Sequence, residues 1–169
     1  MVAGEVLRIG VTGHRRLADV EVVAASVDAV LDRWRGAVLE VRSMLAEGAD
    51  RLVTEQAMLR PGNRFVAVLP LEPRDYLADF EDPASATAFC QLLAAAASIE
   101  VSPPGPDPSR EAAYERAGRA VVETSDVLVA LWDGGASRGR GGTAEMVAYA
   151  RERGVPVEVV PVRRPSAAP

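Results

Sequence analysis

Two neighbouring segments near the C-terminal end hold the residues best suited to chemistry. The first is the apolar run 127–132, which ends at Asp133 and Gly134. The second is the short segment Gly141-Gly142-Thr143-Ala144-Glu145. A buried strand, a glycine-rich loop and a helix with a carboxylate in its first turn together form a typical binding site. Glycines let the backbone approach a ligand, and free N–H groups at a helix start attract an anion. Glu145 supplies an acceptor or a nucleophile.

Three further loops follow apolar segments and carry polar side chains. His14 and Arg15 would present a donor and a fixed cation to a phosphate or a carboxylate, although both residues also fit a solvated turn. Acidic residues in the second loop fit either ligand contact or capping of the next helix. Arg74 fits an exposed loop position as well as a ligand contact. The candidate residues in these loops are Gly10, Thr12, Gly13, His14 and Arg15, then Glu47, Gly48 and Asp50, then Pro70 and Arg74.

Strands and helices alternate along the chain, which predicts an α/β fold: a Rossmann-like, doubly wound, mostly parallel sheet with helices on both faces. We expect one domain over residues 1–162 and a disordered tail over 163–169. The expected strands are 6–11, 38–44, 64–69, 99–101, 127–132 and 156–162. The expected helices are 19–34, 49–59, 76–97 with an optional break at Pro83, 110–123 and 143–153.

In such sheets ligands bind beyond the carboxyl ends of the strands, where successive connections leave for opposite faces. We therefore expect the strand 6–11 to lie near the centre of the sheet, beside the strand 127–132. In that arrangement Arg15 and Glu145 approach the same crevice, although they are far apart in the sequence.

Composition excludes several kinds of chemistry. All 19 basic residues are arginines, so neither a Schiff-base lysine nor a phosphate-loop lysine is available. Cys90 and His14 are the single cysteine and the single histidine, which leaves no disulfide framework and disfavours a zinc site. Gly10 and Gly13 lack the third glycine of a dinucleotide fingerprint. We expect no metal and no organic cofactor.

Charge and hydropathy limit the partners. The net charge of −5 disfavours broad binding to nucleic acid. The N-terminal residues lack the pattern of a signal peptide, and no apolar run reaches the ~18 residues of a membrane span. We expect a cytoplasmic protein with no membrane partner. The alanine-rich stretch 86–97 favours a homodimer.

The combined motifs resemble those of the SLOG superfamily, over residues 6 to about 162. That superfamily includes the Lonely Guy phosphoribohydrolases, the DNA-processing Smf proteins and small stand-alone bacterial domains proposed as sensors of nucleotide-derived signals. The Lonely Guy motif Pro-Gly-Gly-x-Gly-Thr-x-x-Glu binds phosphate and supplies a catalytic glutamate. This chain lacks the proline and has one residue, not two, between Thr143 and Glu145. The resembling segments are Gly10 to Arg15, Leu45 to Asp50, Ser125 to Gly134 and Gly141 to Glu145.

Two functions follow, and the sequence leaves open whether the protein is an enzyme. The first is binding or sensing of a nucleotide or a nucleotide-derived ligand, with its phosphate on Gly141 to Thr143 and Gly13 to Arg15. Glu145 or Asp133 would then hold the ribose hydroxyls. The second is an N-glycosidase that cleaves nucleoside monophosphates, with Glu145 as the catalytic carboxylate and His14 as the acid that protonates the leaving base.

Overall fold

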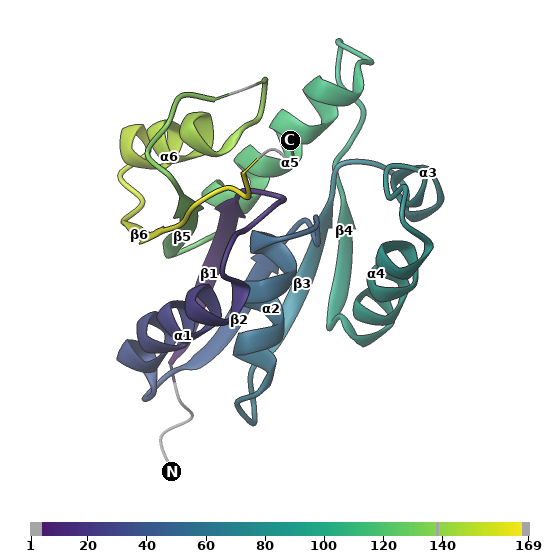
Figure 1. Cartoon of the computed structure of the whole chain (residues 1–169). Helices are drawn as coiled ribbons and strands as arrows, with labels where there is room; N and C mark the ends of the chain where they lie inside the picture. Colours follow the sequence, from purple (N-terminus) through teal and green to yellow (C-terminus); the bar gives the residue numbers. More distant parts are fainter. Residues whose placement is uncertain (1–4, 138, 167–169) are drawn as a thin grey trace.

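The structure is a computed structural model that describes residues 5–137 and 139–166. Six strands form one parallel sheet in the order β4-β3-β2-β1-β5-β6 (Figure 1). This arrangement confirms the predicted Rossmann-like α/β class. The strands are β1 (Val6–Gly13), β2 (Val38–Ser43), β3 (Arg64–Leu69), β4 (Ser98–Val101), β5 (Val127–Trp132) and β6 (Val157–Pro161).

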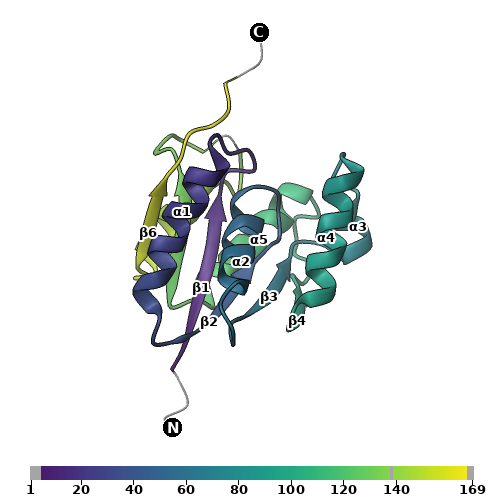
Figure 2. The same ribbon diagram turned by 60° about the horizontal axis from the view of Figure 1, so that its bottom comes forward.

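Helices cover both faces of the sheet (Figures 1 and 2). The helices that precede β4 pack on one face, whereas the helix between β4 and β5 and the helix after β5 pack on the other face. Among the described residues, no helix has the length and apolar character to cross a membrane. The helices are α1 (Val20–Leu31), the 3-10 helix η1 (Asp32–Trp34), α2 (Ala49–Met58), α3 (Pro73–Leu77), α4 (Pro83–Ala95), α5 (Arg110–Glu123) and α6 (Thr143–Glu152).

Burial of both sheet faces explains the continuous apolar run in β5. Val129 faces the core beneath α1 and α2, whereas Leu128 packs with Val121 of α5 and Ala150 of α6. Successive side chains of a strand point to opposite faces, so a strand covered on both sides has no position for a polar residue. The same reasoning accounts for the exact prediction of the bounds of β5.

Two predicted segments differ from the structure. The expected helix 76–97 is two helices, because Pro83 begins α4 and the Asp82 side chain accepts the Ala84 N–H at 2.9 Å. Residues 163 and 164 of the expected tail contact the rest of the domain. Ala18 donates its N–H to the Arg163 carbonyl at 2.9 Å, and Arg164 pairs with Asp133 at 2.9 Å. Residues 167–169 of that tail lie outside the described residues.

At the centre of the sheet, the connections after two neighbouring strands leave for opposite faces. β1 lies between β2 and β5, with Gly10 opposite Arg42 on one side and Gly13 opposite Leu131 on the other. After β1 the chain enters α1 on one face, and after β5 it enters α6 on the opposite face. The prediction that β1 and β5 are neighbours is confirmed. A crevice between diverging connections is therefore expected at their carboxyl ends.

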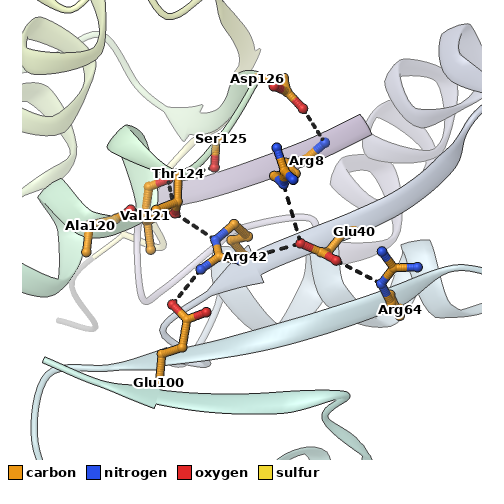
Figure 3. Close-up of polar contacts among 10 residues, drawn as sticks. All are labelled: Arg8, Glu40, Arg42, Arg64, Glu100, Ala120, Val121, Thr124, Ser125 and Asp126. Carbon is orange, nitrogen blue, oxygen red and sulfur yellow. Dashed lines mark hydrogen bonds and ion pairs between the residues drawn. The ribbon is translucent and has the colours of Figure 1, made fainter. Parts of the chain in front are cut away.

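A polar network crosses the face of the sheet that α5 partly covers (Figure 3). The buried Arg42 of β2 donates to the Thr124 hydroxyl at 2.7 Å and pairs with Glu100 of β4 at 2.5 Å. It also reaches Glu40 at 3.4 Å, and Glu40 pairs with Arg64 of β3 at 2.8 Å. The network thus joins three strands to the C-terminal end of α5.

Replacing Arg42 with methionine is expected to lower the free energy of unfolding by about 1–3 kcal/mol. The loss stays below that of an isolated buried charge, because Glu40 keeps Arg64 and Glu100 is half exposed. Urea denaturation followed by circular dichroism measures the change. Arg35→Met is the control: Arg35 is exposed and pairs only with Asp32 of its own turn, so a change below about 0.5 kcal/mol is expected. Equal effects of the two substitutions would contradict a stabilising role for the network.

Candidate functional site

A cleft of about 480 Å³ opens at the carboxyl ends of β1 and β5. Its walls come from the loop after β1, the start of α2, the middle of α5 and the loop that leads into α6. The last residues of the chain described by the structure close one side through Arg164. The cleft thus lies where the topology predicts a ligand site. The predicted residues that line it are Thr12, Gly13, His14, Arg15, Asp50, Gly141, Gly142 and Thr143.

The start of α6 forms the anion-attracting wall of this cleft. Gly142 is the N-cap residue, and no described side chain caps the helix. Thr143 is buried at the first helical position and lines the cleft with Ala144. The first backbone N–H groups of a helix lack partners within the helix and carry a partial positive charge. This wall can therefore accept a phosphate or a carboxylate.

Arginine side chains add positive charge opposite the helix start. The Arg15 guanidinium lies over the ring of Tyr114 on α5, 5.2 Å from the ring centre. Among the described residues, no carboxylate lies within ion-pairing distance of Arg15 or of the adjacent Arg16. Arg140, by contrast, pairs with Asp107 at 2.6 Å. Two cations of the cleft are thus available to an anionic ligand.

His14 joins the loop after β1 to the end of β5. Its Nε2 lies 3.0 Å from Oδ1 of Asp133 and 3.2 Å from the Asp133 backbone nitrogen. The neutral ring can accept the backbone N–H, and the protonated ring can donate to the carboxylate. The N–H of Gly135 and this histidine both lower the pKa of Asp133. Asp133 therefore stays ionised behind His14, and the pair holds two cleft loops together.

Asp50 provides a buried carboxyl group on the floor of the cleft. It is 6% exposed and occupies the first turn of α2. One of its oxygens accepts the Ala46 N–H at 3.3 Å. Burial raises the pKa of Asp50 to about 7, while the backbone hydrogen bonds and the nearby Arg15 charge act in the opposite direction. A carboxyl group so poorly solvated within a cleft is a frequent property of functional sites.

The loops after β1 and β2 touch at Gly48. This residue has a φ of 75°, and a Cβ atom built on it would lie 2.5 Å from the Arg15 carbonyl oxygen. The next residue, Ala49, donates its N–H to the His14 carbonyl at 3.1 Å. Gly48 thus serves the cleft by letting the two loops meet, without lining it.

Several predicted site residues lie outside the cleft. Gly10 sits inside β1, where a Cβ would lie 2.6 Å from the Ser125 hydroxyl oxygen. Glu47 accepts a hydrogen bond from Ser85, and Arg74 is exposed on α3. Glu145 is exposed, and its carboxylate accepts the Gly141 N–H. The residues that do not line the cleft are Gly10, Glu47, Gly48, Pro70, Arg74, Asp133, Gly134 and Glu145.

The structure adds cleft residues that the sequence analysis missed. Tyr114 comes from the middle of a helix, and Met44 and Met146 resemble ordinary core residues in the sequence. Arg164 falls in the expected tail. Among residues 5–137 and 139–166, no group of three or more His, Cys, Asp and Glu side chains is arranged to hold a metal ion.

Comparisons with known proteins support the fold. No protein-family model matches the sequence, and no curated protein matches it. Among the solved structures that match is DNA processing protein A from Helicobacter pylori, described by its single-stranded DNA binding mode. The TM-score is 0.62 with 21% sequence identity, and the match covers 93% of this chain. The chain spans 66% of the length of that protein. The similarity is in the Rossmann-like arrangement of the sheet and its helices.

Proposed function

We propose that this protein binds a nucleotide or a nucleotide-derived small molecule in the cleft between β1 and β5. The observation that carries the proposal is the pairing of two anion-attracting groups in one cleft: the uncapped start of α6 and the Arg15 guanidinium. Phosphate would bind the backbone N–H groups near Thr143, with Arg15 facing it. A cleft of about 480 Å³ falls in the usual range for small-molecule sites.

The lining supports a ligand that has an uncharged part as well. Apolar side chains from β5, α5 and α6 contribute to the cleft, among them Leu128, Val122 and Met146. A heterocyclic base needs such surface, whereas a free phosphate does not. Membership in the SLOG superfamily, as the sequence motifs suggest, is consistent with this ligand class and remains part of the proposal.

The glycosidase alternative receives less support from the geometry. It needs a carboxylate beside the anomeric carbon of the bound nucleotide. Glu145, the residue expected in that role, is exposed and accepts a hydrogen bond from the backbone of its own loop. We therefore propose binding without assigning a reaction. The homodimer and the cytoplasmic location stay predictions.

Replacing Arg15 with methionine is expected to weaken nucleotide binding about tenfold or more, because the guanidinium over Tyr114 is lost while an apolar side chain of similar length is kept. Isothermal titration with nucleoside mono-, di- and triphosphates measures the affinities, and chromatography of the same mixtures detects any released base. Arg74→Met removes an equal charge from an exposed position outside the cleft. This control should leave the affinity within about twofold of wild type.

Two results would contradict the proposal. One is equal weakening by Arg15→Met and Arg74→Met, which would indicate general charge attraction. The other is binding of a single-stranded DNA oligonucleotide with no binding of any mononucleotide. That outcome would favour the ligand class named for the Helicobacter pylori protein.

A further inference from the structure

We propose that Asp50 accepts a hydrogen bond from a ribose hydroxyl, so that the cleft selects ribonucleotides over 2′-deoxyribonucleotides. The inference rests on the proposed function and narrows its ligand class. It starts from a side chain that is 94% removed from solvent yet lines the cleft.

The position of Asp50 suits the sugar of a nucleotide whose phosphate lies on α6. α2 follows β2 and α6 follows β5, and these two strands flank β1 on opposite sides. Neighbouring strands are ~4.8 Å apart, so the ends of β2 and β5 are separated by roughly 10 Å across β1, and the helix starts that follow them both line the cleft. Such a span leaves room for one sugar between the phosphate site and the Asp50 carboxylate. Residues 12–16, at the end of β1 and in the loop after it, also line the cleft.

The chemistry of Asp50 suits a neutral donor. An ionised carboxylate accepts hydrogen bonds at about four lone-pair positions and repels phosphate. The backbone N–H groups of Ala46 and Met44 donate hydrogen bonds to the Asp50 carboxyl group. Among the described residues, no side chain donates a hydrogen bond to Asp50. Acceptor capacity therefore remains at the carboxyl group of a residue that lines the cleft.

The charged side chains near Asp50 make their contacts with other groups and do not occupy its free acceptor positions. The charged and titratable groups that act on Asp50 are Arg15 of the loop after β1, Arg51 of α2 and Tyr76 of α3. Arg51 directs its Nε to the Leu45 carbonyl and another nitrogen to Ser85. Arg15 stacks on Tyr114. Burial raises the pKa of Asp50 to about 7, and a hydroxyl donor would stabilise its ionised form.

The test compares ribonucleoside 5′-monophosphates with their 2′-deoxy counterparts by isothermal titration. Wild-type protein is expected to bind the ribo form of its preferred base about tenfold more tightly or better, as for a lost hydrogen bond to a charged group. Asp50→Asn should reduce that ratio to about threefold or less, because the amide is a weaker acceptor than the carboxylate. Glu47→Gln removes a carboxylate from the loop just before α2, outside the cleft, and it should keep the wild-type ratio.

Four results would overturn the inference. Equal wild-type affinity for ribo and deoxy forms would do so, while leaving the proposed function intact; this comparison needs no variant to fold. A wild-type ratio that persists in a folded Asp50→Asn variant would remove Asp50 from sugar recognition. If that variant instead loses discrimination among bases, Asp50 contacts the base. Absence of binding by every mononucleotide would overturn the proposed function as well.

Discussion

Replacing Gly48 with alanine is expected to lower the free energy of unfolding by about 3–5 kcal/mol, because the residue is partly buried where two loops meet. Two causes add. The backbone φ of 75° is unfavourable for an L side chain by roughly 1–2 kcal/mol, and the new methyl group would overlap the backbone carbonyls of His14 and Arg15. Backbone atoms cannot rotate away as a flexible side chain can. Thermal and urea denaturation measure the loss.

Gly62→Ala separates the two causes. Gly62 has a φ of 86°, and no atom lies within 4 Å of the position that a Cβ would take. This control therefore carries the backbone strain without the overlap, and a loss of about 1–2 kcal/mol is expected. If Gly48→Ala is no more destabilising than Gly62→Ala, the loops after β1 and β2 do not depend on their close approach. Loss of nucleotide binding should accompany Gly48→Ala and not Gly62→Ala.

The second large effect concerns Asp50 and pH. The pKa of this carboxyl group is raised to about 7 in the folded protein from the 3.8 of a free group. Between these values the folded protein binds more protons than the unfolded chain, so its contribution to stability decreases as the pH rises. The contribution is complete below about pH 4 and is lost by about pH 7. A shift of this size corresponds to roughly 4 kcal/mol.

Asp50→Asn is expected to remove most of that slope in the ligand-free protein. The amide oxygen can still accept the Ala46 N–H, and it carries no charge that requires solvation. The variant should therefore be more stable than wild type at pH 8 and similar to it at pH 4. Urea denaturation at several pH values provides both curves, and Glu47→Gln supplies the control for charge loss in the same loop. Parallel curves for wild type and Asp50→Asn would contradict a raised pKa.

The fold could be predicted from local patterns because both sheet faces are covered. Buried strands read as apolar runs, and the predicted bounds of Arg64–Leu69 and Val127–Trp132 agree with the structure. The first strand extends beyond its prediction to Gly13, since pairing with Leu131 continues the ladder through a glycine. Pro83 was an optional break in one helix. The break occurs there, with the Asp82 cap before it, and Tyr76 of α3 packs edge-on against the ring of Phe89 in α4.

Site residues could be predicted only where polar residues come directly after a strand. The loop after β1 and the start of α6 meet because topology brings every parallel strand end to one edge. Topology does not determine the direction in which a side chain within a loop points. Glu145 turns to the Gly141 backbone, and Asp133 supports His14 from behind. Tyr114 lines the cleft from the middle of α5. Its sequence position does not indicate this, because α5 precedes β5 and is not a loop after a strand.

The pairing of β1 with β5 sets the order in which the protein can mature during synthesis. The ribosome releases β1, β2, β3 and β4 well before β5, so one side of β1 has no partner while the first half of the chain is outside the ribosome. An unpaired strand side can join a strand of another nascent chain. Emergence of β5 closes that side, and the cleft is complete only after α6 and Arg164 have followed. A chain that stops before β5 therefore keeps one unpaired side of β1 and lacks the cleft walls that β5 and α6 supply.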